Sequence, residues 1–244
     1  MIEASNPFDR LADNYDAFRS GYSRELYDTL NEYGIKPGME VLDIACGTGL
    51  ASEPLAKRGV KITGVDVSEP MLEKARERVK MGEFVRGEAE NLPFGARTFD
   101  ATICAQAIHW FDQPKALAEM TRVVRPGGKV AVWWKKMDMD DPLRGLRQQA
   151  AEAVGVKQPG DLMQTGFRAF YDHPFRERWL RVLGHVIMTD VDRWLGYERS
   201  RARTKQFGDK WAIYLQELER VMRETAAGKP FQVRYAQFLY IAEV

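Results

Sequence analysis

The sequence predicts an α/β protein with a doubly wound, mostly parallel sheet, and two observations support this fold class. Short apolar segments alternate with amphipathic segments from Val41 to Trp134, the pattern of strands separated by covering helices. The segment 99–108 is apolar along most of its length, as in a parallel strand buried on both faces. With 244 residues, the chain can form one such domain with an insertion, or two small domains.

The segment 40–55 combines a strand, a glycine turn and a helix. Its strand, 41–44, leads through Gly47 and Gly49 into a segment with helical apolar spacing. Glycine lets the backbone approach a ligand closely, and the first turn of a helix offers unpaired N–H groups. The next strand ends at Asp66, 19 positions after Gly47. That spacing is close to the ~20 residues expected for an acidic residue that binds ribose hydroxyls, so a nucleotide site is predicted.

Two residues distinguish between cofactor classes at this site. Ser52 stands where a dinucleotide fingerprint has its third glycine, and Asp43 would repel a pyrophosphate but suit a cationic ligand. With Asp43, Ala45, Gly47 and Gly49, the stretch resembles the first motif of class I S-adenosylmethionine-dependent methyltransferases, acidic-x-Gly-x-Gly-x-Gly, with Ala45 replacing a glycine. The resemblance implies a Rossmann-like, seven-stranded sheet whose last strand is antiparallel. It also implies S-adenosyl-L-methionine as cofactor and S-adenosyl-L-homocysteine as product.

The resemblance extends to other cofactor segments. The loop 87–94 resembles the family's adenine loop, in which Glu88 and Ala89 would contact the adenine edge. The segment 11–23 resembles an N-terminal lid, in which Tyr15 covers the cofactor and Arg19 lies near its carboxylate; a solvated amphipathic helix is the alternative. The expected cofactor-binding residues are Tyr15, Arg19, Asp43, Ala45, Cys46, Gly47, Thr48, Gly49, Asp66, Val67, Met71, Glu88, Ala89 and Gln106.

The acceptor is expected at the end of the fourth strand, because ligands of open α/β sheets bind at the carboxyl ends of strands. The strand is followed by Gln-Ala-Ile-His-Trp-Phe-Asp, and His109 is a candidate general base, an orienting hydrogen-bond partner or a structural residue. The Asn-Pro-Pro-Tyr or Asp-Pro-Pro-Tyr motif common in nucleic-acid amino-methylating enzymes is absent here, which favours a small-molecule acceptor. The expected acceptor-binding residues are His109, Trp110, Trp134, Arg168 and Tyr171.

The whole chain, 1–244, is interpreted as one methyltransferase domain with an N-terminal lid at 8–32 and an inserted helical cap at about 138–185. The cap resembles that of relatives that methylate small carboxylic acids, of the trans-aconitate methyltransferase kind. Other expectations are a turn at 125–128, a strand at 129–134, helices near 143–154, 176–183, 190–207 and 209–227, and strands at 186–188 and 231–242.

Composition limits the function classes. The 36 basic and 35 acidic residues give no broad nucleic-acid footprint, although Arg193, Arg199, Arg201, Arg203 and Lys205 gather on one expected helix. The leading prediction is methyl transfer to an O or N atom of a small, planar or anionic acceptor. An RNA methyltransferase or RNA-binding protein and a non-catalytic S-adenosylmethionine-binding module are the alternatives, and a nicotinamide dehydrogenase is disfavoured.

The two cysteines, Cys46 and Cys104, have no metal-ligand spacing. They favour a reducing, cytoplasmic setting without a bound metal. Neither a signal peptide nor an apolar run long enough to cross a membrane is recognised. The sequence does not define the oligomeric state.

Overall fold

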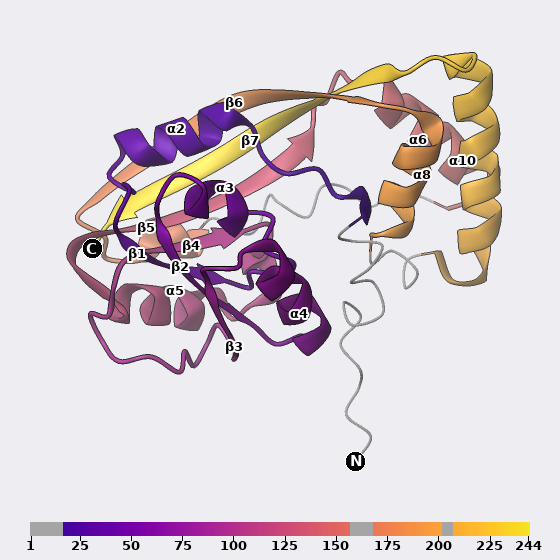
Figure 1. Ribbon diagram of the computed structural model, residues 1–244. Helices are drawn as coiled ribbons and strands as arrows, with labels where there is room; N and C mark the ends of the chain where they lie inside the picture. Colours follow the sequence, from indigo (N-terminus) through magenta and orange to yellow (C-terminus); the bar gives the residue numbers. More distant parts are fainter. Residues whose placement is uncertain (1–16, 157–167, 202–206) are drawn as a thin grey trace. The chain divides into compact units, whose positions relative to one another are not determined.

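The computed structural model describes residues 17–156, 168–201 and 207–244, and contains a seven-stranded sheet in the order β3-β2-β1-β4-β5-β7-β6 (Figure 1). The strands are β1 (Glu40–Ile44), β2 (Lys61–Asp66), β3 (Glu83–Arg86), β4 (Phe99–Ala105), β5 (Val124–Met137), β6 (Glu177–Thr189) and β7 (Phe231–Glu243). The helices are α2 (Arg24–Glu32), α3 (Ser52–Ala56), α4 (Glu69–Arg78), α5 (Gln113–Arg122), α6 (Pro142–Ala153), α7 (Arg168–Asp172), α8 (Val191–Arg199) and α10 (Trp211–Ala226). Two 3-10 turns, η1 (Ile108–Trp110) and η3 (Gly208–Lys210), complete the described elements.

The sheet is mixed, with its first five strands parallel. β1 pairs in parallel with both β2 and β4, and the parallel pairing continues to β3 on one side and β5 on the other. Between β5 and β7 the order reverses, because the Gly127 N–H donates to the Val244 carbonyl while the Asp138 N–H donates to the Arg234 carbonyl. Rising numbers in β5 therefore meet falling numbers in β7, which is antiparallel pairing. The doubly wound fold with an antiparallel last strand is confirmed.

Alternate strand residues face opposite sides of the sheet and build two cores. Val41 and Trp133 pack in the core that holds apolar residues of α2, α3 and α4. Leu42 and Trp134 pack in the core that holds apolar residues of α5 and α7. The strand period of two residues thus places the adjacent tryptophans of β5 on opposite faces.

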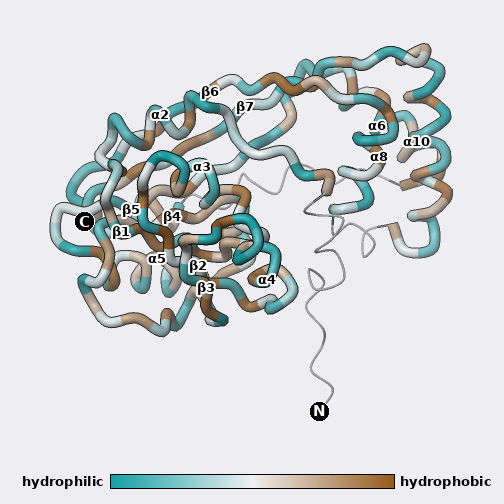
Figure 2. Tube along the Cα trace, viewed as in Figure 1, coloured by the Kyte–Doolittle hydropathy of each residue, from teal (hydrophilic) through white to brown (hydrophobic). Residues whose placement is uncertain are grey.

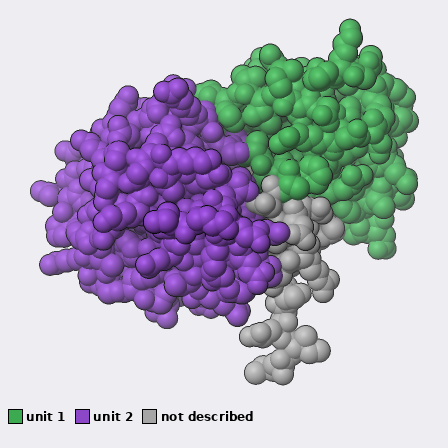
Figure 3. Space-filling model, viewed as in Figure 1, with its two compact units in different colours: residues 1–20, 136–161, 184–236 green, residues 21–135, 162–183, 237–244 purple. Residues whose placement is uncertain are grey.

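The chain divides into two compact units (Figure 3). Unit 2 comprises 21–135, 162–183 and 237–244 and contains the parallel part of the sheet; unit 1 comprises 1–20, 136–161 and 184–236. The core of unit 1 is built from α6, α8, α10 and the first half of β7. Figure 2 shows hydrophobic residues interspersed with hydrophilic ones along α10, as expected for a helix that buries one face.

Two expectations for the segments after β4 are wrong. The predicted helix at 176–183 is the first half of β6, the last strand in the sheet order, whose exposed positions include charged side chains at 177, 178 and 181 as well as the apolar Leu180 and Val182. Charged residues are typical of an edge strand, where they hinder pairing with other chains, and here they obscured the strand pattern. The predicted turn at 125–128 belongs to β5, whose register against β4 shifts from Phe99–Val124 to Ala101–Lys129.

The N-terminal expectation is tested only in part. Residues 8–16 of the expected lid lie outside the described residues. Within the expected lid, residues 19–23 are not helical and α2 begins at Arg24. Ser23 caps α2: both its hydroxyl and its carbonyl oxygen accept from the Leu26 N–H at 3.2 Å.

Candidate functional site

Three residues of the turn after β1 have backbone conformations in the left-handed region. Ala45, Gly47 and Gly49 have φ values of 53°, 54° and 78°. A Cβ added at Gly49 would lie 3.4 Å from the Ala75 Cα, an ordinary contact distance, so the positive φ is what favours glycine at this position. A Cβ added at Gly47 would meet nothing within 4 Å, so the backbone there borders open space. Both glycines therefore serve the positive-φ turn, and the Gly47 N–H is used in a hydrogen bond to the Asp66 carboxylate.

Asp43 and Thr48 bring unpartnered polar atoms to this turn. Asp43 is fully buried, and its Oδ2 accepts a 2.6 Å hydrogen bond from the Ser52 hydroxyl. Its Oδ1 and the Thr48 Oγ1 are buried without a hydrogen-bond partner among the described residues. Since buried polar atoms are normally hydrogen-bonded, both atoms are candidates for contact with a ligand. Ser52, for which the sequence predicts no binding role, supports Asp43 through this hydrogen bond.

Burial raises the pKa of Asp43 to about 7, with the Ser52 hydrogen bond opposing the shift and the charge of Asp66 adding to it. The carboxyl group is therefore partly protonated near neutral pH. A cationic group placed beside it would favour the ionised form. This is the electrostatic behaviour expected where a ligand carries an ammonium or sulfonium charge.

Asp66 links the ends of β1 and β2. Its Oδ2 accepts from the Gly47 N–H and its Oδ1 from the Ser68 N–H, both at 2.9 Å. Each carboxylate oxygen can accept more than one hydrogen bond, so both oxygens retain capacity for a ligand hydroxyl. Beside it, Val67 is exposed and Met71 is buried.

The expected adenine loop is supported by α5. Glu88 is exposed and bridges to Asn91, whereas Ala89 is buried. Glu90 accepts a 2.9 Å hydrogen bond from the Asp112 N–H, which ties the loop to the start of α5. The loop is also held by Glu119, whose Oε2 accepts from the Leu92 N–H at 2.8 Å, a support that sequence analysis missed.

The end of β4 carries Gln106, an expected cofactor residue, followed by the expected acceptor residues His109 and Trp110. Gln106 has a φ of 60°, and its Nε2 donates to the Lys135 carbonyl at 3.0 Å. The Trp134 indole Nε1 donates to the His109 Nδ1 at 3.3 Å, and partial burial lowers the pKa of His109. Trp110 is 60% exposed, with its ring 5.0 Å from that of His109.

Aromatic contacts extend from this strand end to α7. The rings of Trp134 and Tyr240 lie 6.3 Å apart, and Tyr240 lies 6.3 Å from Tyr171. Tyr240 was not anticipated, because it belongs to β7, more than 100 positions after β5 in the sequence. Tyr171 is half exposed, and the exposed Arg168 forms an ion pair with Asp172 at 3.2 Å.

The expected lid residues and basic helix belong to unit 1. Tyr15, Arg203 and Lys205 lie outside the described residues. The Arg19 Nε donates to the Ser200 Oγ at 3.0 Å, and its guanidinium lies 4.8 Å from the Tyr197 ring centroid. Arg201 forms a 3.3 Å ion pair with Glu198.

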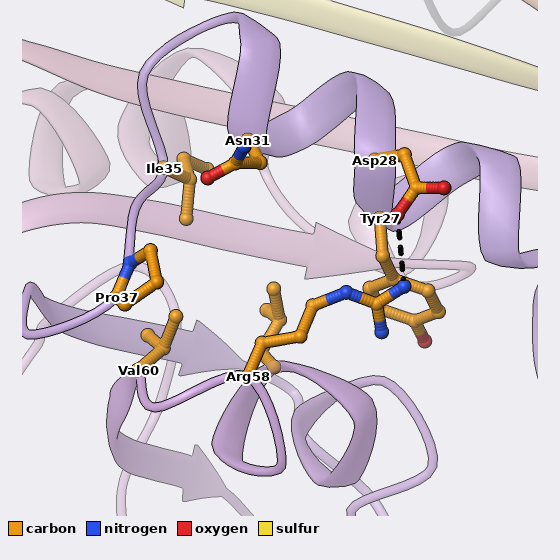
Figure 4. Close-up of a pocket in the computed structure, with 8 residues that line it drawn as sticks. Tyr27, Asp28, Asn31, Ile35, Pro37, Arg58 and Val60 are labelled. Atoms are coloured by element: carbon orange, nitrogen blue, oxygen red, sulfur yellow. Dashed lines mark hydrogen bonds and ion pairs between the residues drawn. The ribbon is translucent and has the colours of Figure 1, made fainter.

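A separate cavity of about 240 Å³ lies between α2 and the loops before β1 and β2 (Figure 4). Arg58 crosses this cavity and pairs with Asp28 at 3.1 Å. None of the expected cofactor or acceptor residues lines it. The cavity is therefore distinct from the site at the strand ends.

Two kinds of feature are absent from residues 17–156, 168–201 and 207–244. Neither a cluster of three or more His, Cys, Asp or Glu side chains arranged to hold a metal nor a helix long and apolar enough to cross a membrane was found.

Comparison with known proteins identifies the family. Residues 42–132 match the family model described as a methyltransferase domain. The chain is 30% identical over 205 residues to the demethylmenaquinone methyltransferase of Paenarthrobacter aurescens, covering 77% of this chain and 80% of that protein. It is 34% identical over 128 residues to the malonyl-[acyl-carrier protein] O-methyltransferase of Serratia marcescens, covering about half of each (52% and 50%).

Among solved structures, a candidate type II methyltransferase of Anaeromyxobacter dehalogenans matches with a TM-score of 0.74 and 25% identity. The match covers 93% of this chain and 98% of that one. The glycine turn after β1, the acidic end of β2 and the strand order agree with these similarities. The chain belongs to the class I S-adenosylmethionine-dependent methyltransferases.

Proposed function

We propose that this methyltransferase transfers the methyl group of S-adenosylmethionine to an O or N atom of a small, planar or anionic molecule. The observation that carries the proposal is the turn after β1, where the buried Asp43 Oδ1 and Thr48 Oγ1 lack partners among the described residues. Beside them, the backbone at Gly47 borders open space and Asp66 closes the turn. These groups fit a ligand with a cationic centre and ribose hydroxyls.

The donor supplies an electrophilic methyl group on a sulfonium, and the residues of this chain bind and orient it. Asp43 offers a carboxyl group that a nearby cation would ionise, and Asp66 offers acceptors for ribose hydroxyls. The buried Ala89 and exposed Glu88 would flank the adenine, with Val67 providing apolar surface. Arg19 and Tyr15 are proposed as contacts from the lid.

The acceptor is proposed to bind beside His109 and Trp110, with Tyr171 contributing aromatic surface and Arg168 a positive charge. Trp134, expected as an acceptor contact, is buried and instead supports His109 through its indole N–H. The 60% exposure of Trp110 and the aromatic series from Trp134 to Tyr171 support an acceptor that stacks. The names of the two curated relatives, one acting on demethylmenaquinone and one on malonyl-[acyl-carrier protein], support planar or anionic acceptors. Holding the nucleophile in line with the methyl group would supply much of the rate acceleration.

Calorimetry with S-adenosylhomocysteine tests the donor site. We expect a dissociation constant of micromolar order and a loss of roughly 1–3 kcal/mol in Asp66→Ala, the scale of hydrogen bonds to a charged group. Glu83→Ala, which removes an exposed carboxylate from β3, is the control and should leave the affinity unchanged. Equal affinity in wild type and Asp66→Ala would remove Asp66 from the site, and tight NADH binding would contradict the donor assignment.

A screen for release of S-adenosylhomocysteine with carboxylic acids, phenols and amines tests the acceptor class. Turnover of a small molecule would support the proposal. If only RNA were methylated, with binding that weakens steeply as salt rises, the small-molecule assignment would be wrong.

A further inference from the structure

The contact between His109 and Trp134 determines which ring nitrogen of His109 carries its proton. His109 lies in η1, shortly after β4, with its Nδ1 3.3 Å from the Trp134 Nε1. Trp134 is buried in β5, and an indole N–H can only donate. Nδ1 must therefore accept, and the neutral ring carries its proton on Nε2.

This tautomer opposes a role as general base. Nε2 is already protonated in the neutral ring and cannot take a second proton. Protonating Nδ1 would turn it into a donor facing the Trp134 N–H, and this hydrogen bond would be lost. Burial of the ring also lowers the pKa of His109, and no charged side chain among the described residues contributes to that shift.

We propose that His109 donates a hydrogen bond from Nε2 to the methyl acceptor, that Trp134 is the positioning residue that fixes this tautomer, and that the attacking atom is an oxygen that is already anionic. A carboxylate or an enolate is the ligand class that fits. This inference rests on the proposed small-molecule function and narrows its acceptor.

Methyl transfer to an oxygen that is already anionic needs no base. A lone pair of the oxygen anion forms the new O–CH₃ bond, and the S–CH₃ bond breaks with its electron pair going to sulfur. The sulfonium and the anion become a neutral thioether and a neutral ester or ether, so no proton is released. The Nε2–H can hold the second oxygen of a delocalised anion while the first attacks, which orients the nucleophile without occupying its reacting lone pair. A neutral hydroxyl or an ammonium group would instead need a base, which this tautomer does not provide.

Nitrogen-15 NMR of histidine-labelled wild-type protein tests the tautomer without any acceptor. The chain has three histidines, and the spectrum of His109→Gln identifies the signals of His109. At pH 7 we expect a neutral ring with a protonated Nε2 and an unprotonated Nδ1. In Trp134→Phe, which removes the donor and keeps an aromatic side chain, the Nδ1–H tautomer should become populated. A protonated Nδ1 in the wild type at pH 7 would overturn the proposal, whatever the outcome for methyl transfer.

Kinetics with the carboxylate acceptor from the screen test the role. His109→Gln keeps an N–H donor but has no basic nitrogen, whereas His109→Ala removes both. We expect kcat/KM to fall ~10-fold or more in the alanine variant, as for loss of a hydrogen bond to a charged group, and to be largely retained in the glutamine variant. The pH profile should be the same in all three proteins. Equal losses in both variants, together with disappearance of a pH-dependent limb, would identify a base and overturn the proposal. Absence of turnover with every small acceptor would instead contradict the proposed function, and the NMR result would still decide the tautomer.

Discussion

Asp43 is a carboxyl group whose only described hydrogen-bond donor is the Ser52 hydroxyl. Burial makes its ionised form costly, and one hydroxyl donor does not compensate. The sequence shows that this residue is acidic and precedes the glycines. The sequence does not show that Oδ1 lacks a partner among the described residues, because burial and hydrogen bonding depend on the neighbouring β2 and α3.

Replacing Asp43 with Asn should change how stability depends on pH. The pKa of Asp43 is about 7 in the folded chain, against ~3.9 for an unperturbed Asp. Between these values the folded state binds more protons than the unfolded state, so the free energy of unfolding falls as pH rises, by at most ~1.4 kcal/mol per pH unit. The asparagine variant lacks this titration. The free energy of unfolding of the wild type should therefore fall relative to that of Asp43→Asn between about pH 4 and pH 7. Above pH 7 the difference between the two proteins should be constant.

Urea unfolding of both proteins at a series of pH values measures this difference. Ser52→Ala serves as a matched variant, because losing the hydrogen bond that favours ionisation should extend the pH-dependent window upward. A difference that is constant from pH 4 to 8 would show that Asp43 is ionised throughout.

Ala45→Gly should be neutral or stabilising, in contrast to most alanine-to-glycine changes. Ala45 has a φ of 53°, a region that costs an L-residue roughly 1–2 kcal/mol, while glycine adds about 0.5–1 kcal/mol of unfolded-chain entropy. Ala118, exposed within α5, is the control, and Ala118→Gly should cost ~1 kcal/mol. Thermal unfolding of both variants checks the contrast, and an equal loss in the two would contradict strain at Ala45.

At the scale of elements, the sequence predicted the alternation of strands and helices from β1 to β5, and it placed β1, β2 and β4 with small errors at their ends. Each of these elements carries a local signal, such as the glycines after β1 or the proline at the start of α4. β6 was misassigned because its Arg and Glu side chains hide a strand that only its partner, β7, stabilises. The aromatic contact of Trp134 with Tyr240 was equally hidden, since it depends on the antiparallel return of β7.

Two glycine-to-alanine changes should have opposite effects on the stability of the folded chain. A Cβ at Gly128 in β5 would lie 2.3 Å from the Asp100 carbonyl oxygen, so the backbone itself must move, and we expect a loss of about 3 kcal/mol or more. A Cβ at Gly145 in α6 would meet nothing within 4 Å, and alanine there should add about 0.5–1 kcal/mol. Denaturant midpoints of the two variants test this directly. Tolerance of Gly128→Ala would show that β4 and β5 approach less closely than the structure indicates.

At the scale of the whole molecule, the proposed donor residues divide unequally between the two units. Those that follow β1, β2, β3 and β4 all belong to unit 2, whereas unit 1 contributes Tyr15 and Arg19. The class I strand order predicts that the donor residues of unit 2 lie together, because parallel strands end at one edge of the sheet. The long β5, β6 and β7, which supply residues to both units, follow from no local signal in the sequence.

Hydrogen exchange with and without saturating S-adenosylhomocysteine should show this division. Binding to the folded state alone stabilises it, by about 2.7 kcal/mol at a ligand concentration 100 times the dissociation constant, and segments that contact the ligand gain the local protection. We expect slower exchange at 43–49, 64–71 and 86–92 in unit 2, and no local change in α10 of unit 1. If residues 8–22 close over the cofactor, as predicted, exchange in that segment should also slow when the cofactor is bound. Contacts made only in the closed state would favour that state. Identical exchange of 8–22 in both samples, with protection at 43–49, would leave the donor site in unit 2 and remove Tyr15 and Arg19 from it.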